Sequence, residues 1–178
     1  MPRPYKRDRT MTPNDAFLLQ LIESQRMLDM VMGDISADML AWRPSDNVHP
    51  IGAIYAHAVG LEDMYVQQFI QGQPLVWASG QWAARLGHDL PPNQWNLHSL
   101  LPLDLSVFDE YKHAVFANSQ VFVRGLSASD FERAIPFPGR NWSMSVAQLL
   151  ATTIAHTTSH AGEIALLKGL QGAQGLPY

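Results

Sequence analysis

Two histidines near the end of the chain, His156 and His160, lie four residues apart in the segment "IAHTTSHAGEIALLKGLQG". The apolar spacing around them is typical of a buried helix. On a seven-residue grid they belong to the row that faces the core of a helical bundle, which is made up of Leu149, Thr153, His156, His160, Glu163 and Leu167. His57 occupies the same kind of row in an earlier segment, together with Ile54, Leu61 and Met64. The spacing therefore predicts three imidazoles that point into one interior.

Three inward histidines are difficult to satisfy by hydrogen bonds alone, because a buried imidazole needs partners for both of its ring nitrogens. A divalent metal resolves the problem, since each neutral imidazole gives it a lone pair and the second nitrogen bonds outward. Three ligands from two helices leave coordination positions open, as reactive metal sites do. We predict a divalent-metal site at His57, His156 and His160. A metal-free cluster of hydrogen-bonded core histidines is the alternative.

An open site of this kind could lower the pKa of a bound water molecule, or it could take a substrate thiolate. The sequence "HTTSH" has the spacing of the zinc-protease helix but lacks the glutamate after its first histidine, so that mechanism lacks its base. Glu163 follows His160 by about one turn. It could be a fourth ligand, a general base, an acceptor that orients a ligand, or the partner of a cation. The catalytic residue is therefore left open, with Glu163 as the candidate.

Other ionisable side chains are weaker candidates for a site. Glu62 and Asp63 follow His57 by five and six residues and fall partly off the inner face, so we expect them to meet solvent or a partner helix. Four further histidines are predicted to lie at the surface, with the two in the loop as the best exceptions: His49, His88, His98 and His113.

Four helices must position these residues. Thr12 can cap the first of them, because Pro13 suits the first helical position and Asp15 adds an acid to the first turn. No segment alternates with a period of two, so no sheet of consequence is expected. The pattern predicts an all-α, antiparallel four-helix bundle with helices near residues 13–32, 50–71, 105–124 and 145–169.

The second and third helices are separated by an unusually long loop, "QPLVWASGQWAARLGHDLPPNQWNLHSLLPLD". It carries Trp77, Trp82 and Trp95, whose indoles must be buried somewhere. We interpret the loop as a lid that closes the bundle end nearest the histidines. These tryptophans could also wall a small-molecule pocket.

The composition limits the kind of protein and its partners. The chain has 178 residues, which suits a single domain over 12–178 preceded by a flexible basic tail at 1–11. A net charge of −4 argues against a nucleic-acid partner. No apolar run suits a membrane helix or a signal peptide, so the expectation is a cytoplasmic protein without a membrane partner. The chain contains no cysteine, which leaves histidine and carboxylate as its strong metal ligands.

Two segments resemble the DinB-like family of bacterial four-helix proteins, including its DUF664 relatives. They are "HPIGAIYAHAVGLEDMYVQQ" and "SMSVAQLLATTIAHTTSHAGEIALLKGLQGAQGLP". The best markers are the histidine of the second helix with its "GxED" sequel and the final "HxxxHxGEI". The resemblance extends from about Thr12 onward. It implies a bundle that is often a homodimer, with zinc or nickel bound at the positions of His57, His156 and His160.

Better-understood members of that family include bacillithiol- and mycothiol-dependent enzymes, in which the metal activates a low-molecular-weight thiol. The resemblance thus implies a metal-dependent enzyme that acts on a small molecule by thiol S-transfer or by hydrolysis. A non-catalytic module that binds a metal or ligand in a stress response is a second hypothesis. A metal-free dimerisation scaffold is a third.

Overall fold

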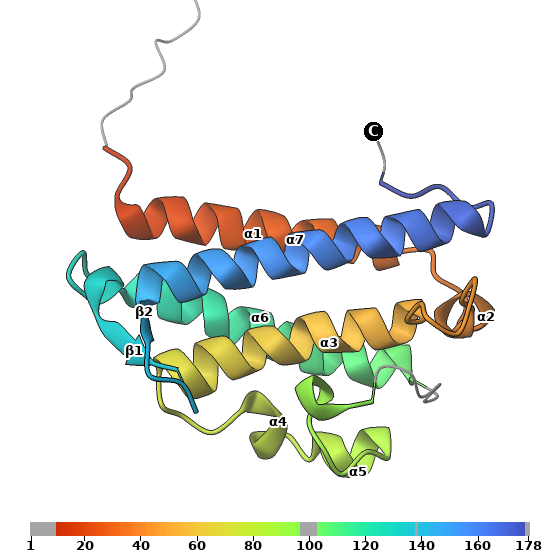
Figure 1. The fold of residues 1–178 in the computed structure, drawn as a ribbon, viewed down its shortest axis with the longest axis horizontal. Coiled ribbons are helices and arrows are strands. Elements are labelled where there is room, and N and C mark those ends of the chain that lie inside the picture. The colour runs from red at the N-terminus through yellow and green to blue at the C-terminus, as the bar shows by residue number, and fades with distance from the viewer. Residues whose placement is uncertain (1–9, 97–102, 138, 177–178) are drawn as a thin grey trace, which may run out of the picture.

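Four long helices form the molecule, as the computed structural model shows for residues 10–96, 103–137 and 139–176 (Figure 1). The predicted all-α bundle is confirmed. Its helices are α1 (Pro13–Met32), α3 (Ile51–Asp63), α6 (Leu105–Gly125) and α7 (Val146–Leu170), and α3 is continued by the π-helical segment η1 (Met64–Ile70).

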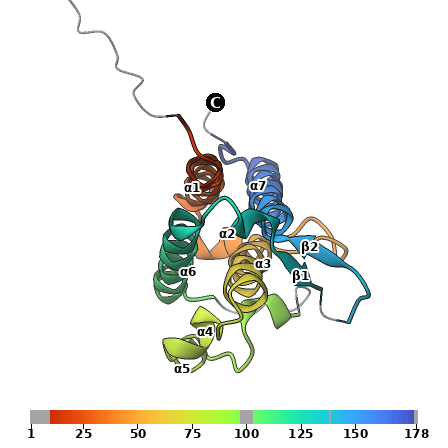
Figure 2. The same ribbon diagram turned by 90° about the vertical axis from the view of Figure 1, so that its left-hand side faces the viewer.

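The directions of the helices are mixed. Helices α1 and α7 run one way and α3 and α6 run the other, so that α3 and α7 are antiparallel neighbours while α1 and α7 are parallel ones (Figures 1 and 2). The long loop after η1 produces this arrangement, because it returns the chain to the end of the bundle where α3 began. Bundles with long crossover connections share this property.

Local signals set the helix ends. Thr12 caps α1 in a capping box with Asp15, and Ser145 does the same for α7 with Gln148. Each box satisfies backbone N–H groups that a helix cannot bond internally. These signals explain why the predicted starts of α1 and α7 nearly coincide with the observed ones.

Short elements connect the long helices. The strands β1 (Ala134–Pro136) and β2 (Ser143–Ser145) pair antiparallel, with Ile135 opposite Met144. They are too short to show the alternation that a sequence pattern needs. The remaining elements are α2 (Ala37–Ala41), α4 (Val76–Ser79), α5 (Trp82–Leu86), η2 (Pro92–Gln94) and η3 (Asp130–Glu132). Within the described residues, no helix is both long and apolar enough to cross a membrane.

The tryptophan loop covers a side of the bundle. Its helices α4 and α5 lie against α3 and α6, on the face turned away from α1 and α7 (Figures 1 and 2). Trp77 and Trp82 are buried, with their rings 5.3 and 5.6 Å from that of Tyr111, and Trp95 packs on Trp77. The indoles are therefore buried along a side of the bundle and not over the end that we expected.

Asp63 holds this loop to the bundle. Its carboxylate accepts hydrogen bonds from the backbone N–H groups of Val76 and Trp77, at 2.9 and 3.1 Å, and from the Tyr111 hydroxyl at 2.8 Å. Asp63 and Glu62 are both 1% exposed, so of the two expected surroundings, solvent or a partner helix, the structure shows the partner helix. Glu62 contacts Gln25 of α1, and Asp63 contacts Tyr111 of α6 and the loop. Both carboxylates are buried because other elements pack against α3 on several sides.

Gly60 lets η2 approach α3 closely. A Cβ placed on Gly60 would lie 2.6 Å from the backbone nitrogen of Asn93 and 2.8 Å from Pro92 Cβ. Backbone cannot yield as a flexible side chain can, so Gly60→Ala should destabilise the protein by about 1–3 kcal/mol. Urea unfolding of the variant measures the loss.

Gly162 is the matched control for that substitution. It is also helical, and an added Cβ would meet nothing within 4 Å. Alanine there should raise the free energy of unfolding by about 0.5–1 kcal/mol. Equal effects of the two alanines would contradict the close approach at Gly60.

Candidate metal centre

The three predicted histidines meet between α3 and α7. His57 projects from α3, and His156 and His160 project from adjacent turns of α7. The Nε2 atom of His156 lies 3.2 Å from His57 Nε2 and 3.0 Å from His160 Nε2. All three side chains are half-buried. We searched the described residues for histidine, aspartate and glutamate side chains whose ligand atoms converge. The three histidines form such a group, with their ligand atoms all within 4.8 Å of one another.

These separations suit a shared metal ion. Ligand nitrogens about 2.0–2.1 Å from a tetrahedral zinc ion are about 3.3 Å apart, and an octahedral arrangement brings them slightly closer. The observed values of 3.0 and 3.2 Å fall in this range. The three-histidine group could therefore hold a metal ion, and histidine nitrogen suits several divalent transition metals.

The surroundings keep two of these imidazoles neutral. Burial lowers the pKa of His156 to about 3, and repulsion from His160 and His57 adds to the effect. Burial also lowers the pKa of His57, again with a contribution from His160. A neutral imidazole has a lone pair to give, so the site presents the protonation state that a metal ligand requires.

Glu163 contacts the group from the outside. Its Oε2 accepts a hydrogen bond from His160 Nδ1 at 2.7 Å. This contact places the proton of His160 on Nδ1 and leaves the Nε2 lone pair facing the other two histidines. Of the roles considered for Glu163, the contact fits the acceptor that orients a ligand.

The histidines lie at the edge of the buried face of α7 and not at its centre. The centre of the buried face includes Thr153, Thr157, Ala161 and Ile164, whereas Glu163 is exposed. The two histidines therefore stay partly open to solvent, although Leu149 and Leu167 of the same predicted row are buried.

The remaining histidines have different surroundings. His113 is exposed, as predicted, while His49 and His88 are half-buried. The ring of His88 lies 4.3 Å from that of Trp95. His98 lies outside the described residues.

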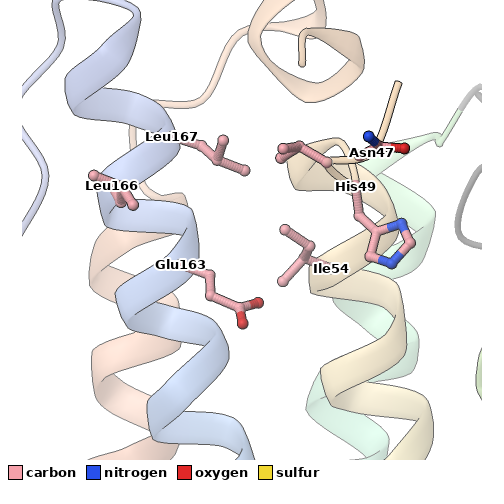
Figure 3. Close-up of a pocket in the computed structure, with 7 residues that line it drawn as sticks. Asn47, His49, Ile54, Glu163, Leu166 and Leu167 are labelled. Carbon is pink, nitrogen blue, oxygen red and sulfur yellow. The ribbon is translucent and has the colours of Figure 1, made fainter. Parts of the chain in front are cut away.

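A pocket of about 280 Å³ opens beside the histidine group, between α7 and the start of α3 (Figure 3). Its aliphatic walls are Val48, Ile54, Leu166 and Leu167, and Glu163 completes them on the side of His160. None of the three tryptophans lines this pocket. Sequence reasoning missed Val48 and Leu166, because the pocket walls come from a loop and from the outer side of a helix.

Known proteins support the fold and the family. A model of the DinB superfamily matches residues 20–164, a span that contains all three histidines and Glu163. The crystal structure of a conserved protein from Enterococcus faecalis has a TM-score of 0.76 and covers 90% of this chain and 98% of its own, at 12% sequence identity. No curated protein matches. Because the family model spans most of the bundle, the chain belongs to the DinB superfamily.

Proposed function

We propose that this protein is a metal-dependent enzyme that acts on a small molecule by thiol S-transfer or by hydrolysis. The observation that carries the proposal is the convergence of three Nε2 atoms, with two separations of 3.0 and 3.2 Å. Three ligands leave coordination positions for a substrate, unlike the four of a closed structural site. Zinc or nickel is the proposed metal.

Each residue has a proposed role. His57, His156 and His160 bind the ion through Nε2, and Glu163 holds the proton on His160 Nδ1 so that this ring keeps its orientation. The chemistry that a bound divalent ion supplies here is Lewis acidity toward a water molecule or a thiol. The chain has no cysteine, so for S-transfer we propose a low-molecular-weight thiol as the co-substrate that supplies the sulfur nucleophile.

A non-catalytic module that binds a metal or ligand in a stress response is the second candidate. The contact between Glu163 and His160 favours it, because a carboxylate committed to orienting a ligand is less available as a general base. Both candidates need the metal, and turnover separates them.

The test uses untagged protein loaded with zinc or nickel. We expect turnover either of a p-nitrophenyl ester or of an electrophile such as monobromobimane with a low-molecular-weight thiol, and we expect His57→Ala to abolish it. The thiol panel should include cysteine, bacillithiol and mycothiol. Metal bound at one equivalent with no turnover of either class would support the binding module, and no metal under any loading would remove both candidates.

We also propose that the protein is a cytoplasmic homodimer. Apolar residues make up 47% of the chain, and Leu19 of α1 and Val121 of α6 are 52% and 66% exposed. A two-fold dimer would cover such side chains with the same surface of a second copy. Sedimentation velocity at micromolar concentration should show a dimer, and a monomer alone would contradict this proposal.

A further inference from the structure

The pocket and the histidine group share one residue. Glu163 lines the pocket, and its carboxylate also accepts the hydrogen bond from His160 Nδ1 at 2.7 Å. Figure 3 shows this side chain pointing from α7 into the gap toward Ile54 of α3. A molecule in the pocket would therefore lie one side chain away from a metal ligand.

The remaining walls are mostly aliphatic. Val48, Ile54, Leu166 and Leu167 make up four of the seven lining residues. The volume of about 280 Å³ exceeds the roughly 150 Å³ in which a protein cavity can hold benzene. The pocket thus has room for an aromatic ring or a branched alkyl group with a short substituent.

The polar part of the lining sets the charge of the ligand. Glu163 brings a carboxylate, and the other polar residues, Asn47 and His49, bring an amide and an imidazole. A carboxylate at the wall repels an anion and accepts a hydrogen bond from a hydroxyl or an ammonium group. Among the residues that the structure describes, the lining includes no lysine or arginine that would attract an acid.

We propose that this pocket binds the apolar part of an uncharged or positively charged small molecule, whose hydroxyl or ammonium group bonds to Glu163. This inference rests on the proposed function, because the pocket ligand is the substrate only if the metal site beside the pocket is catalytic. The expected substrates are aryl or branched-alkyl compounds with a hydrogen-bond donor, in preference to carboxylates and phosphates.

Methyl NMR of the untagged, zinc-loaded protein tests the inference with three probes of similar shape: benzyl alcohol, benzylamine and benzoate. We expect the first two to shift the Leu166 and Leu167 methyl signals. Benzoate should bind at least about tenfold more weakly, because it brings a second carboxylate to Glu163.

Two exposed leucines of α7 provide a matched pair of variants. Leu166 lines the pocket and is 64% exposed, whereas Leu170 lies one turn further on, is 58% exposed and lines no part of it. Leu166→Glu should weaken benzyl alcohol binding about tenfold, since it places a charge in the apolar wall. Leu170→Glu should leave binding unchanged, and both variants should fold because both positions tolerate a polar side chain.

The same titration on metal-free protein separates the two proposals. If the chain takes up no metal but benzyl alcohol binds and Leu166→Glu weakens it, the pocket is real and the proposed function fails. If zinc is held while benzyl alcohol produces no shift, the pocket inference alone is overturned. Benzoate that binds as tightly as benzyl alcohol, or equal binding to both glutamate variants, would overturn it too.

Discussion

Replacing His160 with alanine is expected to abolish binding of zinc or nickel. A carboxylate holds the orientation of His160, through the 2.7 Å contact with Glu163. Its loss leaves two nitrogens, those of His57 and His156, 3.2 Å apart. Two neutral ligands bind a divalent ion far more weakly than three, so the affinity should fall by more than the roughly 10–100-fold typical of a lost outer partner. Elemental analysis and calorimetric titration of untagged protein measure it.

Two further variants make that experiment specific. His113→Ala changes an exposed histidine of α6 and should leave the metal content unchanged. Glu163→Gln keeps an acceptor oxygen but removes the charge. It should therefore lower the metal affinity by a smaller factor than His160→Ala, within about 10–100-fold. Acid should release the metal from the wild type as the histidines take up protons. A His160→Ala protein with a full complement of metal would show that the three imidazoles are a polar cluster and not a metal site.

Glu62→Gln is expected to stabilise the protein at pH 8 by up to about 3 kcal/mol. Glu62 is 1% exposed, and burial raises the pKa of its carboxyl group from 4.5 to about 7. Between these two values the folded state keeps a proton that the unfolded state has lost. Stability therefore falls as the pH rises from 4.5 to 7 and then levels off.

The amide of glutamine resembles the protonated acid. Its oxygen can accept from Gln25 Nε2, as Glu62 Oε1 does at 2.7 Å, and its NH₂ can donate to the Ser119 hydroxyl, which lies beside the carboxyl group. Urea unfolding of both proteins from pH 4 to pH 8 measures the effect. The gap should be small at pH 4 and should grow up to pH 7.

The difference between the two proteins isolates Glu62. His57 and His156 have lowered pKa values, so they make stability rise with pH below about 6.5, equally in both proteins. Glu23→Gln on the exposed face of α1 is the control and should leave the pH profile unchanged. A Glu62→Gln protein that is less stable than the wild type at pH 8 would show that the buried carboxylate is held by its partners after all.

The sequence by itself determined the helices and the three histidines. Thr12 and Ser145 begin α1 and α7 through contacts within four residues of themselves, so local pattern was sufficient to find those ends. His156 and His160 must share a helix face because they are one turn apart. His57 could be grouped with them because the core-facing rows of all the helices in a bundle point into the same interior.

Only the tertiary structure decided how the rest is arranged. Which helices run parallel depends on where the long loop returns the chain. Trp77 and Trp82 hold that loop in place by packing on Tyr111 of α6, which is distant in the sequence. The burial of Glu62 and Asp63 depends on Gln25 and Tyr111, which lie 37 and 48 residues away along the chain. The pocket joins residues 47–54 of one segment to Glu163, Leu166 and Leu167 of another. Such contacts form only when helices pack. The spacing of residues along the chain does not determine the distances between residues on different helices, and packing does.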